Sequence, residues 1–257
     1  MTEMVSAGRR VARFVLLLPE VCANSLRFRV PFLLPRWFRM PSRFRVGSRT
    51  VELQFLDEEG VAADFITCVL RNNYGLGHHL TDVRSIVDVG ASFGFFSLAA
   101  RARYPHAVIH AYEPNPRILP LLRANVAGFG VEIHPEAVGG RDGTVRLIDE
   151  GPSDQARVGI PEMNAQSYQV RQVSLETLVK EAGGRIDLLK LDCEGAEWDI
   201  LKPAACWESV RNVRLEYHLF RGELAEDAAH ALTRLGFRIL HFQQYQEFGG
   251  VIWAERT

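Results

Sequence analysis

The chain has 257 residues, of which 47% are hydrophobic and 24% are charged. This length suits one large α/β domain with a short extension, and the composition is that of a soluble globular protein that needs no metal or disulfide to hold its core. The formal net charge of −1 gives no indication of a nucleic-acid partner. The four cysteines include no CxxC pair, so we expect them to be reduced and the protein to be cytoplasmic.

Residues 1–45 are interpreted as a basic N-terminal arm in front of a domain at 46–257. The first 50 residues carry ten arginines, no lysine and two acids, a net charge of +8, which leaves −9 for the remainder. Aromatic and apolar residues lie between the arginines, a mixture that suits peripheral contact with an anionic membrane or with an anionic acceptor. Packing on the acidic body or on a second subunit is the alternative, and the oligomeric state stays open. No apolar run is long enough to span a bilayer, and no signal peptide is expected.

The elements expected before residue 85 are a helix over roughly 9–18, a β-like stretch over 49–56 and a helix over 62–71 that ends at turn residues. From residue 85 onward, strands and helices alternate. Strands are predicted at 85–89, 107–112, 131–138, 186–191 and 210–217. Helices are predicted at 95–103, 116–127, 174–182, 196–201 and 223–235, with Ser174 as the cap of the third.

This alternation predicts an α/β fold with a mostly parallel, doubly wound sheet. The last two strands, at 237–242 and 251–254, lie too close together for a helical crossover, so we expect an antiparallel hairpin at one edge. Residues 141–173 contain turn signals and short β-like pieces, which predict hairpins laid over one side of the domain.

The loop after the first strand of this sheet, Asp88-Val89-Gly90-Ala91-Ser92-Phe93-Gly94, is the predicted cofactor site. Its glycines let the backbone approach a ligand at the carboxyl end of the strand. The G-x-G-x-x-G fingerprint of dinucleotide sites fails at Ser92 and Phe95, which disfavours a nicotinamide oxidoreductase. The acid at Asp88 would repel a pyrophosphate but suits the ammonium group of S-adenosylmethionine.

The next two strand ends complete this site. Glu113 follows the second strand, where a carboxylate can accept hydrogen bonds from both ribose hydroxyls. Ala137 closes the third strand and is expected to border the adenine ring. Tyr74, which lies before the first strand, is expected to cover the cofactor, with a role in packing as the alternative.

Three segments make the chain resemble the FkbM family of S-adenosylmethionine-dependent methyltransferases. They are IVDVGASFGFFS at 86–97, YEPNP at 112–116 and LKLDCEGAE at 189–197, and LEYH at 215–218 also fits. The resemblance covers the chain from about residue 50 to the C-terminus. It implies a Rossmann-like class I methyltransferase fold, S-adenosylmethionine as the cofactor, and cofactor contacts by the motif residues Ser92 and Asn115. Ser92 stands where the family usually has Asn.

The acceptor is expected at the ends of the fourth and fifth strands, which carry Asp192, Glu194, Glu216 and His218. Methyl transfer to a hydroxyl needs alignment and a base that takes the hydroxyl proton. We predict His218 as that base, because histidine titrates near neutral pH, with Asp192 and Glu216 beside it and Asp192 also near the cofactor. A divalent metal held by Asp192 with Glu194 or Glu216 is the alternative. Glu197 is expected at the surface of the following helix, or as its cap.

The sequence thus predicts a methyltransferase that acts on a hydroxyl of a small polar acceptor. A sugar or a glycoconjugate as the acceptor is implied by the resemblance alone. An N-methyltransferase and a non-catalytic S-adenosylmethionine-binding protein are the alternatives, and the cluster of acids and histidine disfavours the second.

Overall fold

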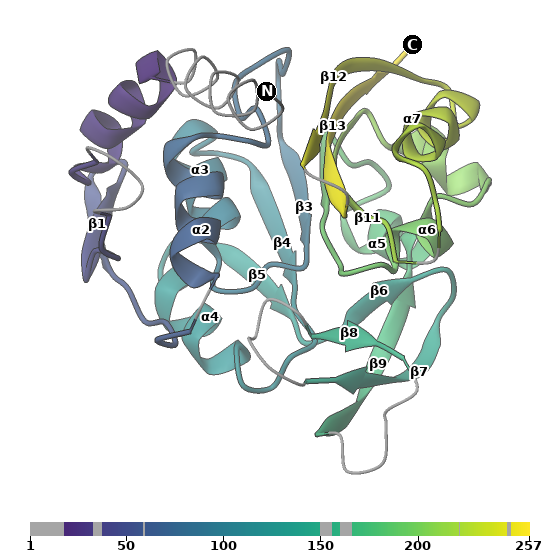
Figure 1. Ribbon diagram of the computed structural model, residues 1–257, viewed down its shortest axis with the longest axis horizontal. Helices are drawn as coiled ribbons and strands as arrows, with labels where there is room; N and C mark the ends of the chain where they lie inside the picture. The colour runs from purple at the N-terminus through teal and green to yellow at the C-terminus, as the bar shows by residue number, and fades with distance from the viewer. Residues whose placement is uncertain are drawn as a thin grey trace, which may run out of the picture.

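The computed structural model describes residues 18–32, 38–58, 60–149, 156–159, 166–220, 222–245 and 248–257. A seven-stranded sheet runs through its centre (Figure 1). Its strands are β3 (Ser85–Val89), β4 (Val108–Tyr112), β5 (Val131–His134), β10 (Leu188–Leu191), β11 (Asn212–His218), β12 (Phe237–Tyr245) and β13 (Gly249–Arg256). Their order across the sheet is β12-β13-β11-β10-β3-β4-β5.

The pairing of these strands confirms the predicted α/β fold. β5, β4, β3, β10 and β11 are parallel neighbours, whereas β13 runs antiparallel to both β11 and β12. The chain moves outward from β3 to β5 and then returns to the other side of β3 with β10. The strand order therefore reverses between β3 and β10, which is where open α/β sheets form a ligand crevice. The predicted hairpin at one edge is β12–β13.

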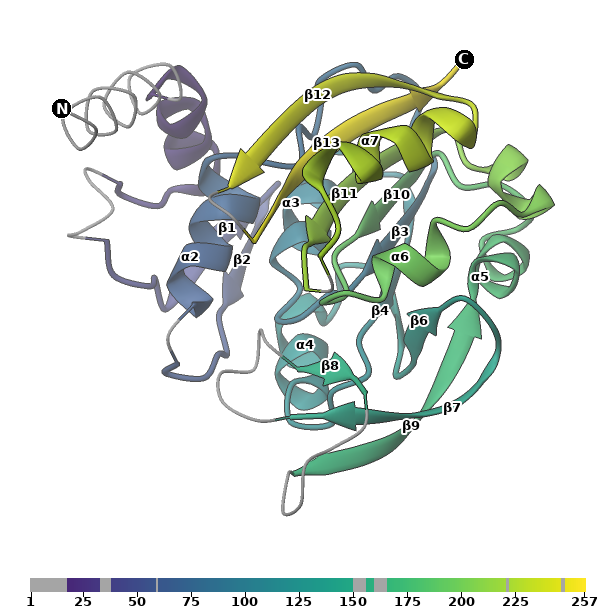
Figure 2. The ribbon, with the colours of Figure 1, turned by 45° about the vertical axis from the view of Figure 1, so that its right-hand side comes forward.

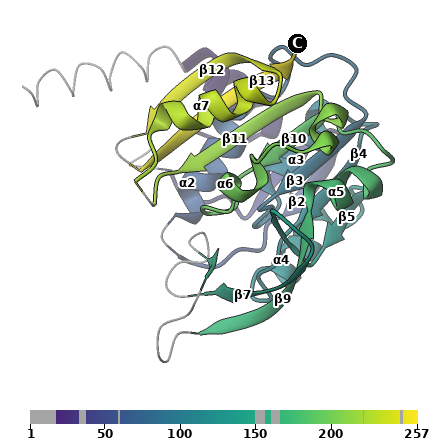
Figure 3. The same cartoon turned by 90° about the vertical axis from the view of Figure 1, so that its right-hand side faces the viewer.

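Helices cover both faces of this sheet because successive strand residues point to opposite sides. Ile86 belongs to the apolar cluster under α3 (Phe95–Arg103) and α4 (Leu119–Val126), and the next residue, Val87, to the cluster under the other helices. Those helices are α5 (Leu175–Glu181), α6 (Glu197–Ile200), the 3₁₀ helix η4 (Ala205–Ser209) and α7 (Ala225–Arg234). Figure 3 shows α5, α6 and α7 in front of the sheet. The Ser174 side chain accepts a hydrogen bond from the Thr177 N–H, so its predicted capping role is confirmed.

The predicted third strand, 131–138, is wrong in its length. It divides at Pro135 into β5, which pairs with β4, and β6 (Ala137–Gly139), which belongs to a different sheet. Proline cannot donate to a strand ladder, and the Glu136 N–H donates back to the His134 carbonyl, which turns the chain.

The segment predicted as hairpins forms a second sheet with β6. It consists of β7 (Gly143–Ile148), β8 (Arg157–Val158) and β9 (Ser167–Ser174), in the order β6-β9-β7-β8. β7 pairs antiparallel with both β8 and β9, so hairpins are confirmed over the described part of 141–173. Figure 1 shows this sheet below β4 and β5. Residues 150–155 and 160–165 lie outside the described residues.

The described residues before 60 pack onto the domain. Residues 18–28 are helical, β1 (Arg43–Val46) and β2 (Arg49–Glu52) form a hairpin, and both lie beside α2 (Val61–Phe65), as Figures 1 and 2 show. The buried ring of Phe44 contacts the buried rings of both Phe28 and Phe65. The predicted boundary at residue 45 therefore falls inside β1. Most of the helix predicted at 9–18 lies outside the described residues.

The predicted helix over 62–71 is α2 followed without a break by a π-helical segment, η2 (Ile66–Leu70). Within the described ranges, no helix combines the length and the apolar character needed to cross a membrane. All four cysteines are free thiols.

Candidate active site

A cavity of about 1100 Å³ opens at the carboxyl ends of β3, β4, β10 and β11. Val89 and Asp192 line it from the central sheet, Leu147 and Val158 from the second sheet, and Thr67 from η2. Its volume exceeds the upper end of ordinary ligand pockets, about 1000 Å³, so it can hold a nucleoside-sized ligand together with a small acceptor. It lies at the reversal of strand order between β3 and β10.

The first loop approaches the loop after β10 so closely that only glycine fits at residue 90. Gly90 has φ +72°, and a Cβ there would lie 1.7 Å from the Asp192 carbonyl oxygen. The N–H groups of Gly90 and Ala91 both donate to the Tyr112 carbonyl at 3.0 Å, which ties the loop to the end of β4. Gly90 and Ser92 line the cavity, as predicted.

Two other predicted contacts of this loop require correction. Asp88 is fully buried within β3, behind the cavity wall, where Ser97 Oγ donates to it at 2.7 Å and Lys190 Nζ lies 3.3 Å away. Its charge is thus matched inside the protein instead of meeting a ligand ammonium group. Gly94 serves helix packing, since a Cβ there would lie 2.8 Å from the side chains of Leu122 and Val126 on α4.

Glu113 is held at the cavity by backbone donors. Its carboxylate accepts hydrogen bonds from the Ser92 N–H at 2.9 Å and the Asn115 N–H at 2.8 Å. Burial raises the pKa of Glu113 to about 7, although both hydrogen bonds favour the charged form. A carboxylate fixed by its own backbone neighbours at a strand end is suited to accept hydrogen bonds from a pair of hydroxyls.

Asn115 and Ala137 differ in their position relative to the cavity. Ala137 lines the cavity, as predicted. The Asn115 side chain points into the protein, where its amide donates to Asp149 and its oxygen accepts from the Arg117 N–H. Asn115 is 1% exposed, so the predicted direct contact with the cofactor is wrong, and the residue positions Glu113 through its N–H.

Lys190 lies at the centre of the charged side of the site. It occupies the middle of β10, almost fully buried, and its Nζ donates to the carbonyls of Val89 and Gly90 at 3.1 and 2.7 Å. The same Nζ lies 3.3 Å from both Asp88 and Asp192. Burial opposes the lysine charge, but the two carboxylates outweigh it and raise the pKa of Lys190. Lys190 therefore joins the cofactor loop to the acceptor side.

Tyr74 connects two carboxylates at the base of the cavity. Its hydroxyl lies 2.9 Å from Asp192 Oδ2 and 2.6 Å from Glu216 Oε2, and its ring is buried. A phenol has one proton, so Tyr74 donates to one carboxylate at a time. The second contact is favourable when Glu216 itself carries a proton. Tyr74 lines the cavity, as the predicted contact with the cofactor requires, and it is packed at the same time.

The three carboxylates that line the acceptor side have different proton affinities. Burial would raise the pKa of Asp192, but the Lys190 charge outweighs it and lowers that pKa. Burial and then the charge of Asp192 raise the pKa of Glu216 to about 7. Burial raises the pKa of Glu194 to about 8 despite the opposing charge of His218. Asp192 therefore stays ionised at neutral pH, whereas Glu216 exchanges a proton there.

Glu197 was expected at the surface or as a helix cap, and its surface placement is wrong. It is fully buried at the start of α6, and its carboxylate accepts from the N–H groups of Cys193 at 2.7 Å and Gly195 at 2.8 Å. It also lies 3.3 Å from His218 Nδ1. Glu197 thus holds both the loop after β10 and the imidazole at the end of β11.

His218 lies between two glutamates, outside the set of described residues that line the cavity. Its Nδ1 faces Glu197 and its Nε2 lies 3.5 Å from Glu194 Oε1. Burial favours the neutral ring, but the hydrogen bond and charge of Glu197, followed by Glu194 and Asp192, raise the pKa of His218 to about 10. An imidazole that already carries its proton cannot accept another, so these surroundings conflict with the predicted role as general base.

The side chains that could hold a divalent metal on this side of the cavity differ from the predicted ligands. The atoms that could hold an ion within 4.8 Å of one another belong to Asp192, Glu194 and His218, with Glu216 outside this group. A cation there would compete with Lys190 and with the proton on His218, both of which already neutralise these carboxylates.

Sequence reasoning missed Lys190 and misplaced Glu197. A signal for Lys190 was present, since it is a lysine inside the apolar run LLKL that pairs in register with Asp88 of the neighbouring strand. The pairing itself needs the strand order. No comparable signal marks Glu197, because its partners are backbone N–H groups of a loop whose shape the sequence does not reveal.

Comparisons with known proteins agree with this geometry. Residues 88–242 match the family described as Methyltransferase FkbM domain. Methyltransferase sdnD of Sordaria araneosa is 32% identical over 51% of this chain, a match that spans 65% of sdnD. The 31-O-demethyl-FK506 methyltransferase FkbM of Streptomyces tacrolimicus is 29% identical over 74% of this chain and 83% of its own.

A solved structure, precorrin-6y C5,15-methyltransferase of Geobacter metallireducens GS-15, aligns with a TM-score of 0.44 at 14% identity, covering 79% of this chain and 92% of its own. The match of residues 88–242 spans the loop after β3, Glu113, the β10 motif and His218, so it includes both sides of the cavity. The predicted family, enzyme class and S-adenosylmethionine cofactor are thereby confirmed, and the chain belongs to the FkbM methyltransferase family.

Proposed function

We propose that the protein methylates a hydroxyl of a small polar acceptor, a sugar or a glycoconjugate, with Glu216 as the base that takes the hydroxyl proton. The observation that carries this proposal is the group of three carboxylates that line the cavity at the ends of β10 and β11, Asp192, Glu194 and Glu216, of which Glu216 has the pKa nearest neutrality, about 7. A general base works best when its pKa lies near the working pH.

The cavity fits S-adenosylmethionine. The close approach at Gly90 leaves room for a ligand beside the backbone, and the anchored carboxylate of Glu113 can accept from two ribose hydroxyls. Ala137 would border the adenine ring. When bound, S-adenosylmethionine would supply a methyl group on a sulfonium: an aligned acceptor oxygen would take the methyl group, and the neutral thioether would leave.

The acceptor side supplies orientation and a site for the proton. Asp192 is held ionised by Lys190 and can accept a hydrogen bond from one acceptor hydroxyl. Glu216 receives the reacting proton on a carboxylate oxygen, and the Tyr74 hydroxyl then remains on Asp192. His218 and Glu197 act as positioning residues, because they hold Glu194 and the loop after β10 in place.

Support for oxygen as the acceptor atom is chemical. An amine acceptor is already nucleophilic once neutral, whereas a hydroxyl needs a base, and the cavity presents a carboxylate tuned to that task. The name of the Streptomyces relative, a 31-O-demethyl-FK506 methyltransferase, also refers to a methyl group on oxygen. Several carboxylates in one cavity suit an acceptor with several hydroxyl groups, such as a sugar.

The test is transfer of the labelled methyl group of S-adenosylmethionine to a panel of free sugars, nucleotide-linked sugars and matched amino sugars, with the product atom assigned by NMR. We expect label on oxygen, and Glu216→Gln should abolish it while cofactor binding persists. Label on nitrogen would establish the N-methyltransferase alternative. If the protein binds S-adenosylmethionine but transfers no label to any member of the panel, the non-catalytic alternative would be favoured.

We also propose that the arginine-rich arm contacts an anionic surface, on the basis of the net charge of +8 over the first 50 residues. Residues 1–17 carry three of these arginines, Arg9, Arg10 and Arg13, and flotation with anionic vesicles, compared between the full chain and a chain lacking residues 1–17, tests the contact of this segment. Equal flotation of the two would remove membrane contact by residues 1–17.

A further inference from the structure

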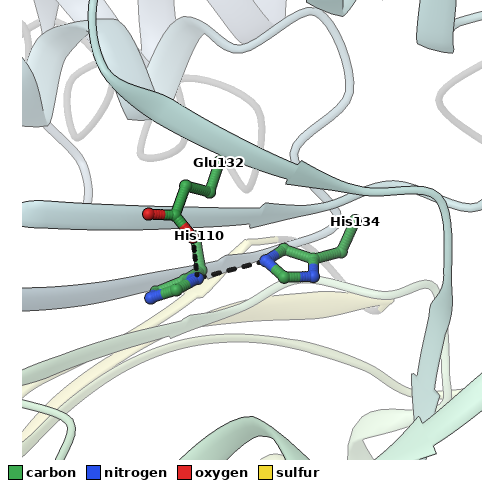
Figure 4. A group of neighbouring side chains, drawn as sticks. All are labelled: His110, Glu132 and His134. Atoms are coloured by element: carbon green, nitrogen blue, oxygen red, sulfur yellow. Dashed lines mark hydrogen bonds and ion pairs between the residues drawn. The ribbon is translucent and has the colours of Figure 1, made fainter. Parts of the chain in front are cut away.

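A second cluster of titratable side chains lies on β4 and β5, apart from the acceptor carboxylates. Figure 4 shows His110, Glu132 and His134 turned toward one another. His110 pairs in register with Glu132, and Tyr112 pairs with His134. Because side chains two residues apart on a strand share a face, all four lie on the side of the sheet that packs against α5. The cluster plays no part in the proposed methyl transfer.

The donor atoms of this cluster have the spacing of a tetrahedral metal site. His110 Nδ1 lies 3.1 Å from His134 Nε2 and 3.5 Å from Glu132 Oε2, and one ligand atom of each residue falls within 4.8 Å of the others. Tetrahedral zinc with ligand bonds of about 2.0–2.2 Å places neighbouring donor atoms about 3.3–3.5 Å apart. Two of the three donor–donor distances are therefore close to this spacing, and the third lies within 4.8 Å.

The remaining nitrogen of His134 faces a carboxylate. His134 Nδ1 lies 3.5 Å from Glu181 Oε2 at the end of α5, and Glu181 also accepts a short hydrogen bond from the Tyr112 hydroxyl. Histidine ligands of metals almost always present their second nitrogen to a carboxylate or carbonyl, which selects the tautomer and the ring orientation. Here that partner is present and is itself held by a tyrosine, so Nε2 of His134 is left as the ligand atom.

The position of the cluster suits a cation. His110 is almost fully buried at the inner side of the cluster, where its ring is held between Glu132 and His134. The side chains of His134 and Glu132 are 21% and 63% exposed, which gives an ion access from solvent. Two imidazoles and one carboxylate form a donor set that Zn²⁺ prefers over Mg²⁺ or Ca²⁺.

We infer that His110, Glu132 and His134 form a binding site for a zinc-like divalent cation at the β4–β5 edge of the sheet, with water in the fourth position. Glu181 orients His134 in this site. The inference concerns metal binding alone and stands or falls independently of the identity of the methyl acceptor.

Binding is tested on the full chain, stripped with a chelator, by calorimetric titration with Zn²⁺ and by the visible absorption of bound Co²⁺. We expect one ion per chain. His134→Gln and Glu132→Gln should each weaken Zn²⁺ binding by about 100-fold or more, because even the partners that orient a ligand are worth about 10- to 100-fold. Glu181→Gln should fall within that smaller range. Affinity should also decrease at acid pH, since protons compete for the imidazoles.

Glu132→Gln keeps the test sound if a histidine variant fails to fold, because Glu132 is largely exposed. The matched control is His230→Gln, an exposed histidine on α7, which packs against β12 and β13 at the other edge of the sheet; this variant should bind Zn²⁺ as the unaltered chain does. Unchanged affinity in both His134→Gln and Glu132→Gln would overturn the inference. So would loss of binding in His218→Gln alone, since that would place the ion among the acceptor carboxylates.

Discussion

The two sides of the cavity are built differently. On the β3–β4 side, uncharged residues and the backbone of the loop after β3 line the cavity together with the carboxylate of Glu113, which is held by main-chain N–H groups. On the β10–β11 side, Lys190, Asp192, Glu216 and His218 form a continuous network of charges. The first construction suits a ligand that is the same in every turnover. The second holds protons and charges that neighbouring groups tune, which suits the reacting acceptor.

The largest effect that separates the two sides of the cavity is expected at Glu216. Glu216→Gln keeps the shape of the side chain but removes the proton acceptor, so kcat should fall by about 100- to 10 000-fold. Cofactor affinity, measured by calorimetry, should stay unchanged because Glu113 and the Gly90 loop are untouched. Glu226→Gln, an exposed glutamate on α7, is the control. Full activity in Glu216→Gln would move the base to another carboxylate, Glu194 first.

Lys190 tests whether the charged network depends on its central cation. Lys190→Met leaves the fully buried Asp88 and the partly buried Asp192 without their positive partner, so the free energy of unfolding should fall by about 3–5 kcal/mol. Urea titration measures this. Adding Asp88→Asn removes one of the two orphaned charges and should restore part of the stability. Lys180→Met, on the exposed side of α5, should have no measurable effect. A double variant no more stable than Lys190→Met would contradict the pairing.

Glu113 tests the side that binds the cofactor. Glu113→Gln keeps one acceptor oxygen but loses the charge, which is worth about 1.5–3 kcal/mol for hydrogen bonds to an ionised group. S-adenosylmethionine should therefore bind about 10- to 150-fold more weakly in calorimetry at pH 8, where Glu113 is ionised. The kcat at saturating cofactor should change little. Unaltered affinity would refute the ribose assignment.

The pH dependence should report Glu216. Its pKa of about 7 is raised above the usual glutamate value, so the carboxyl is protonated and unable to accept a proton below pH 7 and ionised above it. The kcat should therefore rise about tenfold per pH unit up to about pH 7 and then level off. The same sign applies to stability: the folded chain binds the extra proton more tightly, so this contribution is present at low pH and lost as pH rises toward 7. A kcat profile that is flat from pH 5 to 8 would exclude Glu216 as the base.

His218 should have the smallest effect on the rate. As a positioning residue its replacement in His218→Gln should lower kcat by less than about tenfold, whereas loss of a general base costs about 100-fold or more. Because the His218 charge lowers the pKa of Glu216, the midpoint of the pH profile should move to higher pH in this variant. A loss of 100-fold or more, together with disappearance of the pH dependence, would restore His218 as the base.

Local patterns sufficed for most of the fold. Short apolar runs that end in glycine or acid predict β3, β4, β10 and β11, and those strands formed at the expected places. The prediction of one strand over 131–138 was wrong because Pro135 ends pairing with β4, although apolar residues continue beyond it. Such errors arise where the sequence pattern is uniform but the hydrogen-bonding partner changes.

The candidate site was predicted less evenly. Gly90, Ser92, Glu113, Ala137, Asp192 and Glu216 line the cavity as expected, because strand ends bring residues to one edge whatever the side-chain packing. Asp88 and His218 were assigned by the same rule but are turned away from it. Asp88 points into the protein toward Lys190, and the His218 ring is captured by Glu197.

The sequence alone therefore determined the order of strands and helices, the family and the edge of the sheet at which the cavity opens, since these depend on periodicity and on motifs contiguous in the chain. Only the tertiary structure decided which charges meet. Lys190 lies beside Asp88 because β10 pairs with β3. Lys190 also donates to the carbonyl of Gly90, which is 100 residues away in the chain, and no local sequence pattern specifies such a neighbour. Proton affinity depends on such neighbours and on burial, so the raised pKa values of His218 and Glu216, on which the proposed choice of base rests, follow from the fold.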